Sequence, residues 1–142
     1  MQTSRKDIYS YVATLFTSIT KNIYRISVPE TLSSDATTNG FMVLKLDDVR
    51  DFSEISLESY GQVRMYVEFY TPSTNTSTAS GVMNTTRFDT AQIAIDNIIS
   101  AECNKQNQTY SISKESILST DDFFTNKTNS FYVYITSFLI TI

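Results

Sequence analysis

The sequence contains no histidine, and this absence narrows the chemistry open to the chain. Histidine is the commonest general base, the usual partner of serine and cysteine nucleophiles, and a frequent ligand of transition metals. The sequence also lacks a phosphate-binding glycine loop and a Cys-x-x-Cys pair. We therefore expect no catalytic residue, no cofactor and no metal, and we expect that the chain is not an enzyme.

Cysteine, proline and glycine are scarce. The single cysteine, Cys103, excludes a disulfide within the chain and gives no sign of an oxidising compartment. Its position at the end of a helical pattern indicates a semi-buried packing residue. Two prolines and three glycines leave few positions for tight turns, so regular helices and strands should supply most of the order.

Basic clusters are absent as well. The net charge is −4, and Arg5 and Lys6 are the one adjacent pair of cations. Tight binding to a phosphate backbone needs several clustered cations, so the composition argues against a sequence-reading nucleic-acid binder. The polar residues are mostly Ser, Thr and Asn, which form a neutral, hydrogen-bonding surface suited to protein contacts.

No apolar run approaches the roughly 20 residues that span a bilayer. The longest apolar segment is the twelve-residue "FYVYITSFLITI", and the first residues lack the pattern of a secretory signal. We expect a soluble intracellular chain without membrane contact, or one that joins an assembly built inside a cell.

The 142 residues suit one domain, 1–142, with an extended polar loop at 71–86. The spacing of Ile8, Val12, Leu15, Phe16 and Ile19 predicts an amphipathic helix with Thr3 or Ser4 as its cap. A second helical pattern runs from Phe88 to Glu102, with Asp89 or Thr90 as the predicted cap.

Alternation predicts the strands. Val63, Met65, Val67 and Phe69 face one way in "QVRMYVEFY" and polar residues or tyrosines face the other, which is typical of a half-buried strand. Strands are also expected in "NIYRISVP" at a sheet edge, in "FMVLKLDDV", around Ile112, and in the terminal segment. We predict loops at "ETLSSDATTNG" and "TDDFFTNKTNS". The predicted fold is α+β, a mostly antiparallel sheet of about five strands with two helices on one face, in the order α-β-β-β-α-β-β.

The terminal strand is apolar on both faces, so both faces need cover. The two helices can cover one face, and either a neighbouring subunit or a long loop must cover the other. In the polar loop, Val82 and Met83 are the sizeable apolar residues, and we expect them to anchor an arm on a neighbouring subunit; the alternative is a mobile surface loop. The candidate subunit-interface residues are Thr74, Asn75, Thr76, Val82, Met83, Tyr132, Tyr134, Phe138 and Ile140.

Asp47, Asp48 and Asp51 form an acidic edge after a predicted strand. Three close carboxylates can chelate a hard cation, but Arg50 lies among them and the spacing is not that of an EF-hand. We expect a solvated, turn-forming edge. A pair of glycosidase carboxylates stays open as a further alternative, although nothing in the sequence singles one out.

The pattern resembles the tail-terminator, tail-completion and head-tail joining (neck ring) proteins of tailed bacteriophages. The segments that carry the resemblance are "RKDIYSYVATLFTSI", "NIYRISVPE", "FMVLKLDD", "QVRMYVEFY", "RFDTAQIAIDNII" and "FYVYITSFLITI".

The resemblance implies a structural virion protein, assembled in the host cytoplasm. Its copies would form a closed homo-oligomeric ring, six-fold or twelve-fold, that joins portal, adaptor or tail proteins. DNA would pass through the ring as cargo without sequence-specific binding. The alternative from another class is a small non-enzymatic adaptor or chaperone-like module that binds a protein partner.

Overall fold

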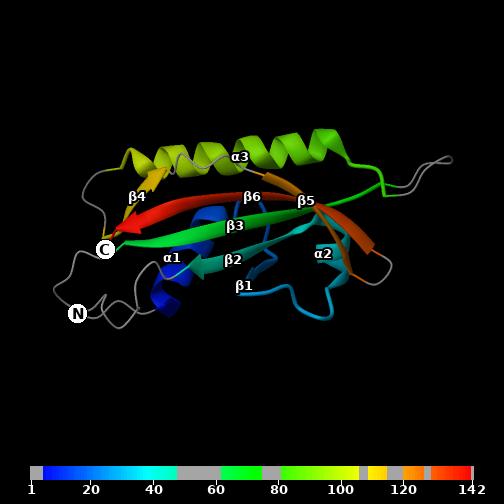
Figure 1. The fold of residues 1–142 in the computed structure, drawn as a ribbon, viewed down its shortest axis with the longest axis horizontal. Coiled ribbons are helices and arrows are strands. Elements are labelled where there is room, and N and C mark those ends of the chain that lie inside the picture. The colour runs from blue at the N-terminus through cyan, green and yellow to red at the C-terminus, as the bar shows by residue number, and fades with distance from the viewer. Residues whose placement is uncertain are drawn as a thin grey trace.

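The computed structural model describes residues 5–47, 62–74, 81–105, 109–114, 120–126 and 129–141. This part of the chain forms three helices and six strands (Figure 1). The helices are α1 (Arg5–Phe16), α2 (Ser34–Asn39) and α3 (Thr85–Cys103). The strands are β1 (Ile23–Arg25), β2 (Phe41–Asp47), β3 (Gln62–Pro72), β4 (Ser111–Lys114), β5 (Thr120–Asn126) and β6 (Asn129–Thr141).

The six strands form one mostly antiparallel sheet, which confirms the predicted α+β class. The strand order is β1-β2-β3-β6-β4, and β5 pairs with the half of β6 that β4 leaves free. The edge strand β1 is the exception, because it runs parallel to β2. β6 therefore holds the sheet together: β3 pairs along one side of it, and β5 and β4 share the other.

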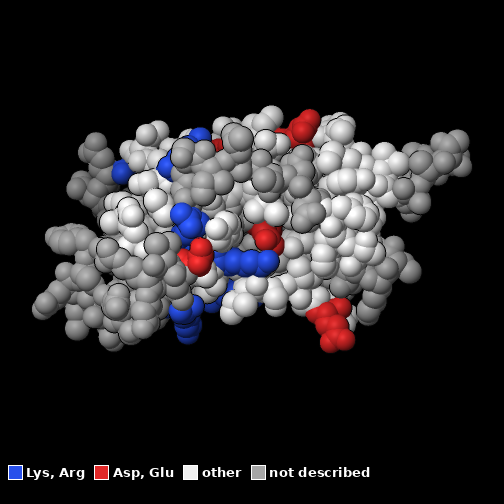
Figure 2. Space-filling model, in the orientation of Figure 1, with Lys and Arg blue, Asp and Glu red and all other residues white. Residues whose placement is uncertain are grey.

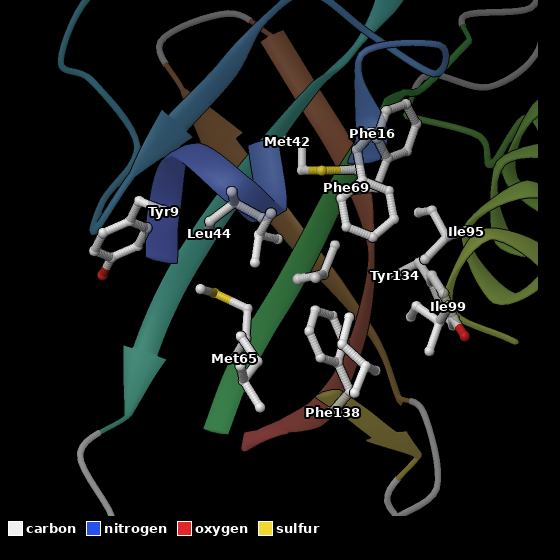
Figure 3. Close-up of a cluster of buried hydrophobic side chains, with 14 of the residues drawn as sticks. Tyr9, Phe16, Met42, Leu44, Met65, Phe69, Ile95, Ile99, Tyr134 and Phe138 are labelled. Atoms are coloured by element: carbon white, nitrogen blue, oxygen red, sulfur yellow. The ribbon is translucent and has the colours of Figure 1, made fainter. Parts of the chain in front are cut away.

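Both long helices pack on one face of the sheet, which we call the first face. Met65 and Phe69 of β3 point to this face, where α1 and α3 cover them (Figure 3). Val67 lies between them on the strand and is buried in the same core. The predicted stripe of α1 is confirmed, since Ile8, Val12 and Phe16 are fully buried; the helix itself ends at Phe16. The buried members of this main core are Ile8, Tyr9, Val12, Phe16, Met42, Leu44, Val63, Met65, Val67, Phe69, Phe88, Ala91, Ile95, Ile99, Ile112, Tyr134, Phe138 and Ile140.

A smaller core lies on the opposite, second face. Phe41 stacks on Tyr70 with ring centroids 4.3 Å apart, and Phe131 meets Phe41 edge-on at 5.1 Å. The segment that follows β1, the helix α2, and β5 cover this core with partly buried apolar side chains. Its members are Ala36, Phe41, Val43, Tyr70, Phe131 and Val133, with Tyr24, Val28, Leu32, Phe124 and Ile135 packed against them.

Gly40 makes the covering of the second face possible. It caps the end of α2 with φ at 93°, a conformation that residues with a Cβ rarely adopt. A Cβ at this position would lie 2.6 Å from the carbonyl oxygen of Tyr70. Glycine is therefore required where the chain turns from α2 directly into β2.

Three details of the sequence prediction are wrong. The predicted loop at "ETLSSDATTNG" contains α2, which Ser33 caps by accepting a hydrogen bond from the Ala36 amide. The predicted loop at "TDDFFTNKTNS" contains β5. The second long helix begins at Thr85 rather than after Asp89 or Thr90, because Asn84 caps it and accepts a hydrogen bond from the Arg87 amide at 3.2 Å.

The prediction for Cys103 is confirmed. α3 ends at Cys103, and that cysteine is partly buried against the main core. The proposed caps of α1 lie outside the described residues. None of the helices in the described ranges is long and apolar enough to cross a membrane.

Candidate functional site

The described ends of the polar segment 71–86 pair with each other, and we call residues 71–74 and 81–82 the base of a hairpin. β3 ends at Pro72, and two residues later Thr74 pairs antiparallel with Val82 through two backbone hydrogen bonds of 2.8 Å. Gly81 precedes the returning residue with φ at 67°, which glycine adopts without strain. Asn75 and Thr76, two of the predicted interface residues, lie outside the described residues.

The base of this hairpin is fixed to β6. The Ser73 amide donates to the Ser130 carbonyl oxygen at 3.0 Å, and the two serine hydroxyl groups are hydrogen-bonded to each other. The Tyr132 hydroxyl donates to the Gly81 carbonyl oxygen at 2.7 Å. The start and end of the segment therefore continue the sheet, at the end of the molecule where α3 begins (Figure 1).

Apolar side chains are exposed beside the hairpin base. Phe123 of β5 is 50% exposed and meets the Tyr132 ring edge-on at 5.1 Å, while Val82 is 36% exposed. We call Val82, Phe123 and Tyr132, together with Thr74, the arm surface. An aromatic residue this exposed is depleted from ordinary surfaces and enriched in protein interfaces. Sequence reasoning missed Phe123, because its segment was assigned to a loop.

Met83 differs from its neighbour Val82. It is partly buried and packs against the main core of its own chain. The sequence prediction paired the two residues as an anchor on a neighbouring subunit. Val82 is exposed, whereas Met83 packs against its own chain and fixes the returning end of the segment to the body of the molecule.

Three of the predicted interface residues are inside the chain. Phe138 and Ile140 are fully buried in the main core, and Tyr134 is 1% exposed. The Tyr134 hydroxyl donates to Asp96 of α3 at 2.7 Å. The prediction that these residues need a neighbouring subunit is wrong, because α1, α3 and the flanking strands of the same chain cover them.

The acidic edge is only partly within the described residues. Asp47 lies 3.5 Å from the Arg64 guanidinium across the β2–β3 pair, which gives it a cation as partner. Asp48 and Asp51 lie outside the described residues. Among the residues that the structure describes, no group of three metal-ligating side chains comes together.

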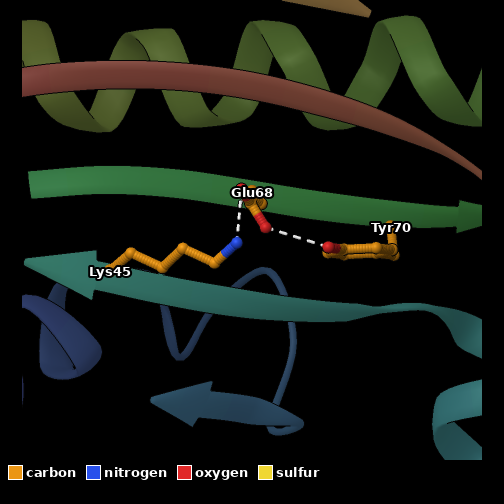
Figure 4. Close-up of polar contacts among 3 residues, drawn as sticks. All are labelled: Lys45, Glu68 and Tyr70. Atoms are coloured by element: carbon orange, nitrogen blue, oxygen red, sulfur yellow. Dashed lines mark hydrogen bonds and ion pairs between the residues drawn. The ribbon is translucent and has the colours of Figure 1, made fainter. Parts of the chain in front are cut away.

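A buried carboxylate lies on the second face, at the border of the smaller core. Glu68 is 9% exposed, and it accepts hydrogen bonds from Lys45 at 3.1 Å and from the Tyr70 hydroxyl at 2.9 Å (Figure 4). The alternation in the sequence of β3 predicted that Glu68 and Val67 point to opposite faces of the sheet. It did not predict that Glu68 is buried. Glu68 and Lys45 therefore form a structural ion pair, which the Tyr70 hydroxyl joins by its hydrogen bond.

A second buried carboxylate joins α3 to α1. Glu102 is 5% exposed, accepts the Tyr11 hydroxyl at 2.6 Å, and pairs with Lys105 at 2.9 Å. Burial raises the pKa of Glu102, but the hydrogen bonds from Tyr11 and Lys105 outweigh it, so the pKa lies below its ordinary value. Burial, and next the bond to Glu102, raises the pKa of Tyr11 well above its ordinary value. Both groups thus keep their usual charge states and tie two helices together.

Charge is sparse on the outside of the molecule. Figure 2 shows one side on which most of the described surface is uncharged and the acidic and basic side chains stand in small groups. A sparsely charged surface rich in Ser, Thr and Asn limits the charge repulsion between two copies of the chain. Neither a known protein-family model nor a curated protein matches the chain.

Proposed function

We propose that the chain is a structural virion protein, a subunit of a closed ring in the neck or tail of a tailed bacteriophage. The ring would hold six or twelve copies around the DNA channel and join portal, adaptor or tail proteins of the same particle. One observation carries the proposal: the hairpin at 71–86 has a base bonded to β6 and exposed apolar side chains beside it. Such a segment suits contact with a neighbouring copy.

Ring closure requires two different surfaces on each copy, because a head-to-tail contact joins unlike patches. The arm surface supplies one. Exposed apolar residues on other elements supply candidates for the other: Ile93 on α3 is 60% exposed, and Ile26, after β1, is 68% exposed. Exposed apolar residues on different elements of one subunit suit the unlike patches that a head-to-tail contact joins.

The charge of the chain suits a channel that DNA passes through. The net charge is −4, and sparse cations give a phosphate backbone little to bind. DNA would therefore be cargo and not a ligand, and the particle would be assembled in the host cytoplasm before release.

The first experiment measures the mass of the purified chain by native mass spectrometry and light scattering over a range of concentrations. We expect a six-fold or twelve-fold species, formed either alone or after addition of the neighbouring virion proteins. A chain that stays monomeric under both conditions would contradict the ring. A monomer that instead binds an unrelated protein would favour the adaptor function.

The second experiment shortens the arm and keeps its base. Replacing residues 75–80 with one asparagine leaves Thr74-Asn-Gly81-Val82, a two-residue Asn-Gly turn of the kind that favours tight hairpins. We expect an unchanged melting temperature, because the bonds from Ser73 and Tyr132 remain, and a loss of ring formation. Rings that form as before would show that the arm is not an assembly element.

Point variants test whether assembly depends on the apolar side chains of the arm surface in particular. Phe123→Ser and Val82→Ser each remove an exposed apolar side chain at the hairpin base and should weaken assembly at least tenfold. Phe88→Ser is unsuitable as a control, because Phe88 is buried. Thr125→Ser, on the same strand as Phe123 and exposed, is the matched control and should assemble as the native chain does.

A further inference from the structure

A pocket of about 390 Å³ opens on the first face, beside the beginning of α3. Its walls come from the turn after α1, the last residue of α2, the end of β3 and the first turns of α3. This volume is at the lower end of the range for pockets that hold small molecules, about 300–1,000 Å³. The pocket shares no lining residue with the arm surface, although Thr71 pairs with Tyr132 across β3 and β6.

The floor of the pocket is apolar. Phe69 of β3 is 6% exposed and lies between Phe16 of α1 and Ile95 of α3 in Figure 3. Ile19 adds an apolar side chain from the turn after α1. On the α3 side, the lining residues Ala91 and Ala94 have small side chains. Two alanines on successive turns leave room for a flat or slender apolar group between the helix and the sheet.

One polar group in this wall lacks a partner. Thr71 follows Phe69 by two residues on β3, so its side chain points to the same face. It is 1% exposed, and its hydroxyl oxygen has no hydrogen-bond partner among the described residues. A buried hydroxyl without a partner costs free energy, so such groups are nearly always satisfied in a protein at work. A ligand in the pocket would supply what the chain does not.

The rim of the pocket is positive. Arg87 lines it, and its Nη1 donates to the Thr38 carbonyl oxygen at 3.1 Å, which holds the side chain across the gap from α3 to α2. Thr86 lies in the first turn of α3, and this turn has no acidic residue to offset the positive end of the helix dipole. The guanidinium has five N–H groups, so it can hold Thr38 and an anion together.

We propose that this pocket binds a small organic carboxylate with a short apolar body. The body lies on Phe69 and Ala91, and the carboxylate lies between the Thr71 hydroxyl and the Arg87 guanidinium at the start of α3. The inference does not depend on ring assembly, because every residue involved belongs to one copy of the chain.

The test titrates the full chain with phenylacetate and hexanoate, using phenylacetamide as the uncharged control, and follows amide chemical shifts by NMR. We expect saturable shifts in residues 18–19, 69–71 and 86–94, and phenylacetate binding about tenfold tighter than phenylacetamide. Absence of saturation at millimolar concentrations, or shifts elsewhere in the chain, would overturn the proposal.

Two variants assign the polar contacts. Arg87→Gln should weaken phenylacetate about tenfold and remove its advantage over phenylacetamide. Arg25→Gln is the matched control, since Arg25 is exposed on β1 and bonds Ser10 instead, and it should change neither affinity. Equal losses in both variants would show attraction to net charge rather than a site, and would overturn the assignment.

Thr71→Val keeps the shape of the side chain and removes the hydroxyl. We expect a higher melting temperature of the free protein, because an unpartnered buried oxygen is gone, and at least fivefold weaker binding of phenylacetate. Unchanged melting together with unchanged affinity would show that water already satisfies the hydroxyl, which contradicts its role in binding.

Discussion

The two faces of the sheet are covered in different ways. On the first face, two helices of 12 and 19 residues close a core that includes Phe16, Met65 and Phe138. On the second face, the six-residue α2, the segment before it and β5 cover the part around Phe41. Beyond that part, the described residues of the second face include charged side chains: Lys45, Asp47, Arg64 and Glu68.

This difference separates the apolar surface that the chain covers by itself from the surface that it leaves exposed. The first face is closed by the chain itself, so no partner can reach Phe138 or Ile140 without unfolding α3. The contacts that we propose with other molecules lie at the margins of that face, at the arm surface and the pocket. Three experiments test the contrast, beginning with the largest expected effect.

Phe138→Ala and Leu139→Ala compare neighbours on β6 that point to opposite faces. Phe138 is fully buried in the main core, so its truncation should cost about 3–5 kcal/mol of unfolding free energy. Leu139 pairs with Arg64 on the second face and is partly exposed, and its truncation should cost about 1 kcal/mol. Urea denaturation followed by circular dichroism measures both. Equal costs would mean that the two faces are closed equally well.

Glu68→Gln tests the border between the covered and the charged parts of the second face. The change removes the negative charge that Lys45 and the Tyr70 hydroxyl both bind, so the unfolding free energy should fall by about 1–2 kcal/mol. Asp47→Asn is the control, because Asp47 pairs with Arg64 at a more exposed position and should cost less than about 0.5 kcal/mol. A larger loss of unfolding free energy in Asp47→Asn than in Glu68→Gln would show that Glu68 does not lie at the buried border.

Glu102→Gln has the smallest expected effect, and it changes the pH dependence of stability. The folded pKa of Glu102 lies below its ordinary 4.5, so its contribution is complete above pH 4.5 and is lost as the pH falls through the folded pKa. The Tyr11 pKa is raised above 10.0, so its contribution is complete below that pH and is lost as the pH rises. In the variant, stability should fall less as the pH drops through the folded pKa of Glu102. It should also fall less at alkaline pH.

Thermal unfolding between pH 3 and pH 11 gives the readout for this pair. Part of the alkaline loss should remain in the variant, since burial is the largest cause of the raised Tyr11 pKa and burial is unchanged. Identical acidic profiles in the native chain and the variant would show that Glu102 contributes no pH-dependent stability.

The long elements followed from sequence pattern, because each buries one regular stripe. The alternation of β3 and the helical spacing of α1 and α3 are strong enough that tertiary contacts did not override them. The α2 helix escaped prediction because it has five polar residues and a single apolar one, Ala36, which makes no stripe; Ser33 and Gly40 define its ends instead. β5 escaped because its Asp and Asn residues disfavour strands, and pairing with β6 holds it in place.

The candidate sites, too, were predicted from the sequence only in part. Sequence predicted that β6 needs cover on both faces, and it does, but a pattern cannot say which element supplies the cover. Here α3 reaches Tyr134 through Asp96, and β5 reaches Phe131 through Phe124. The pocket around Thr71 has no sequence signal at all, because four segments far apart in the chain form it.

β6 comes last among the described elements, yet it lies between β3 and the pair β4–β5. During synthesis, at about 5–20 residues per second, the hydrogen-bonding edge of β3 stays open until β6 leaves the ribosome. Pairing of Val63 with Ile140 closes a loop of most of the chain, and such distant contacts fold slowly. Until β6 pairs with it, the open edge of β3 is a template on which another copy of the chain can pair and aggregate.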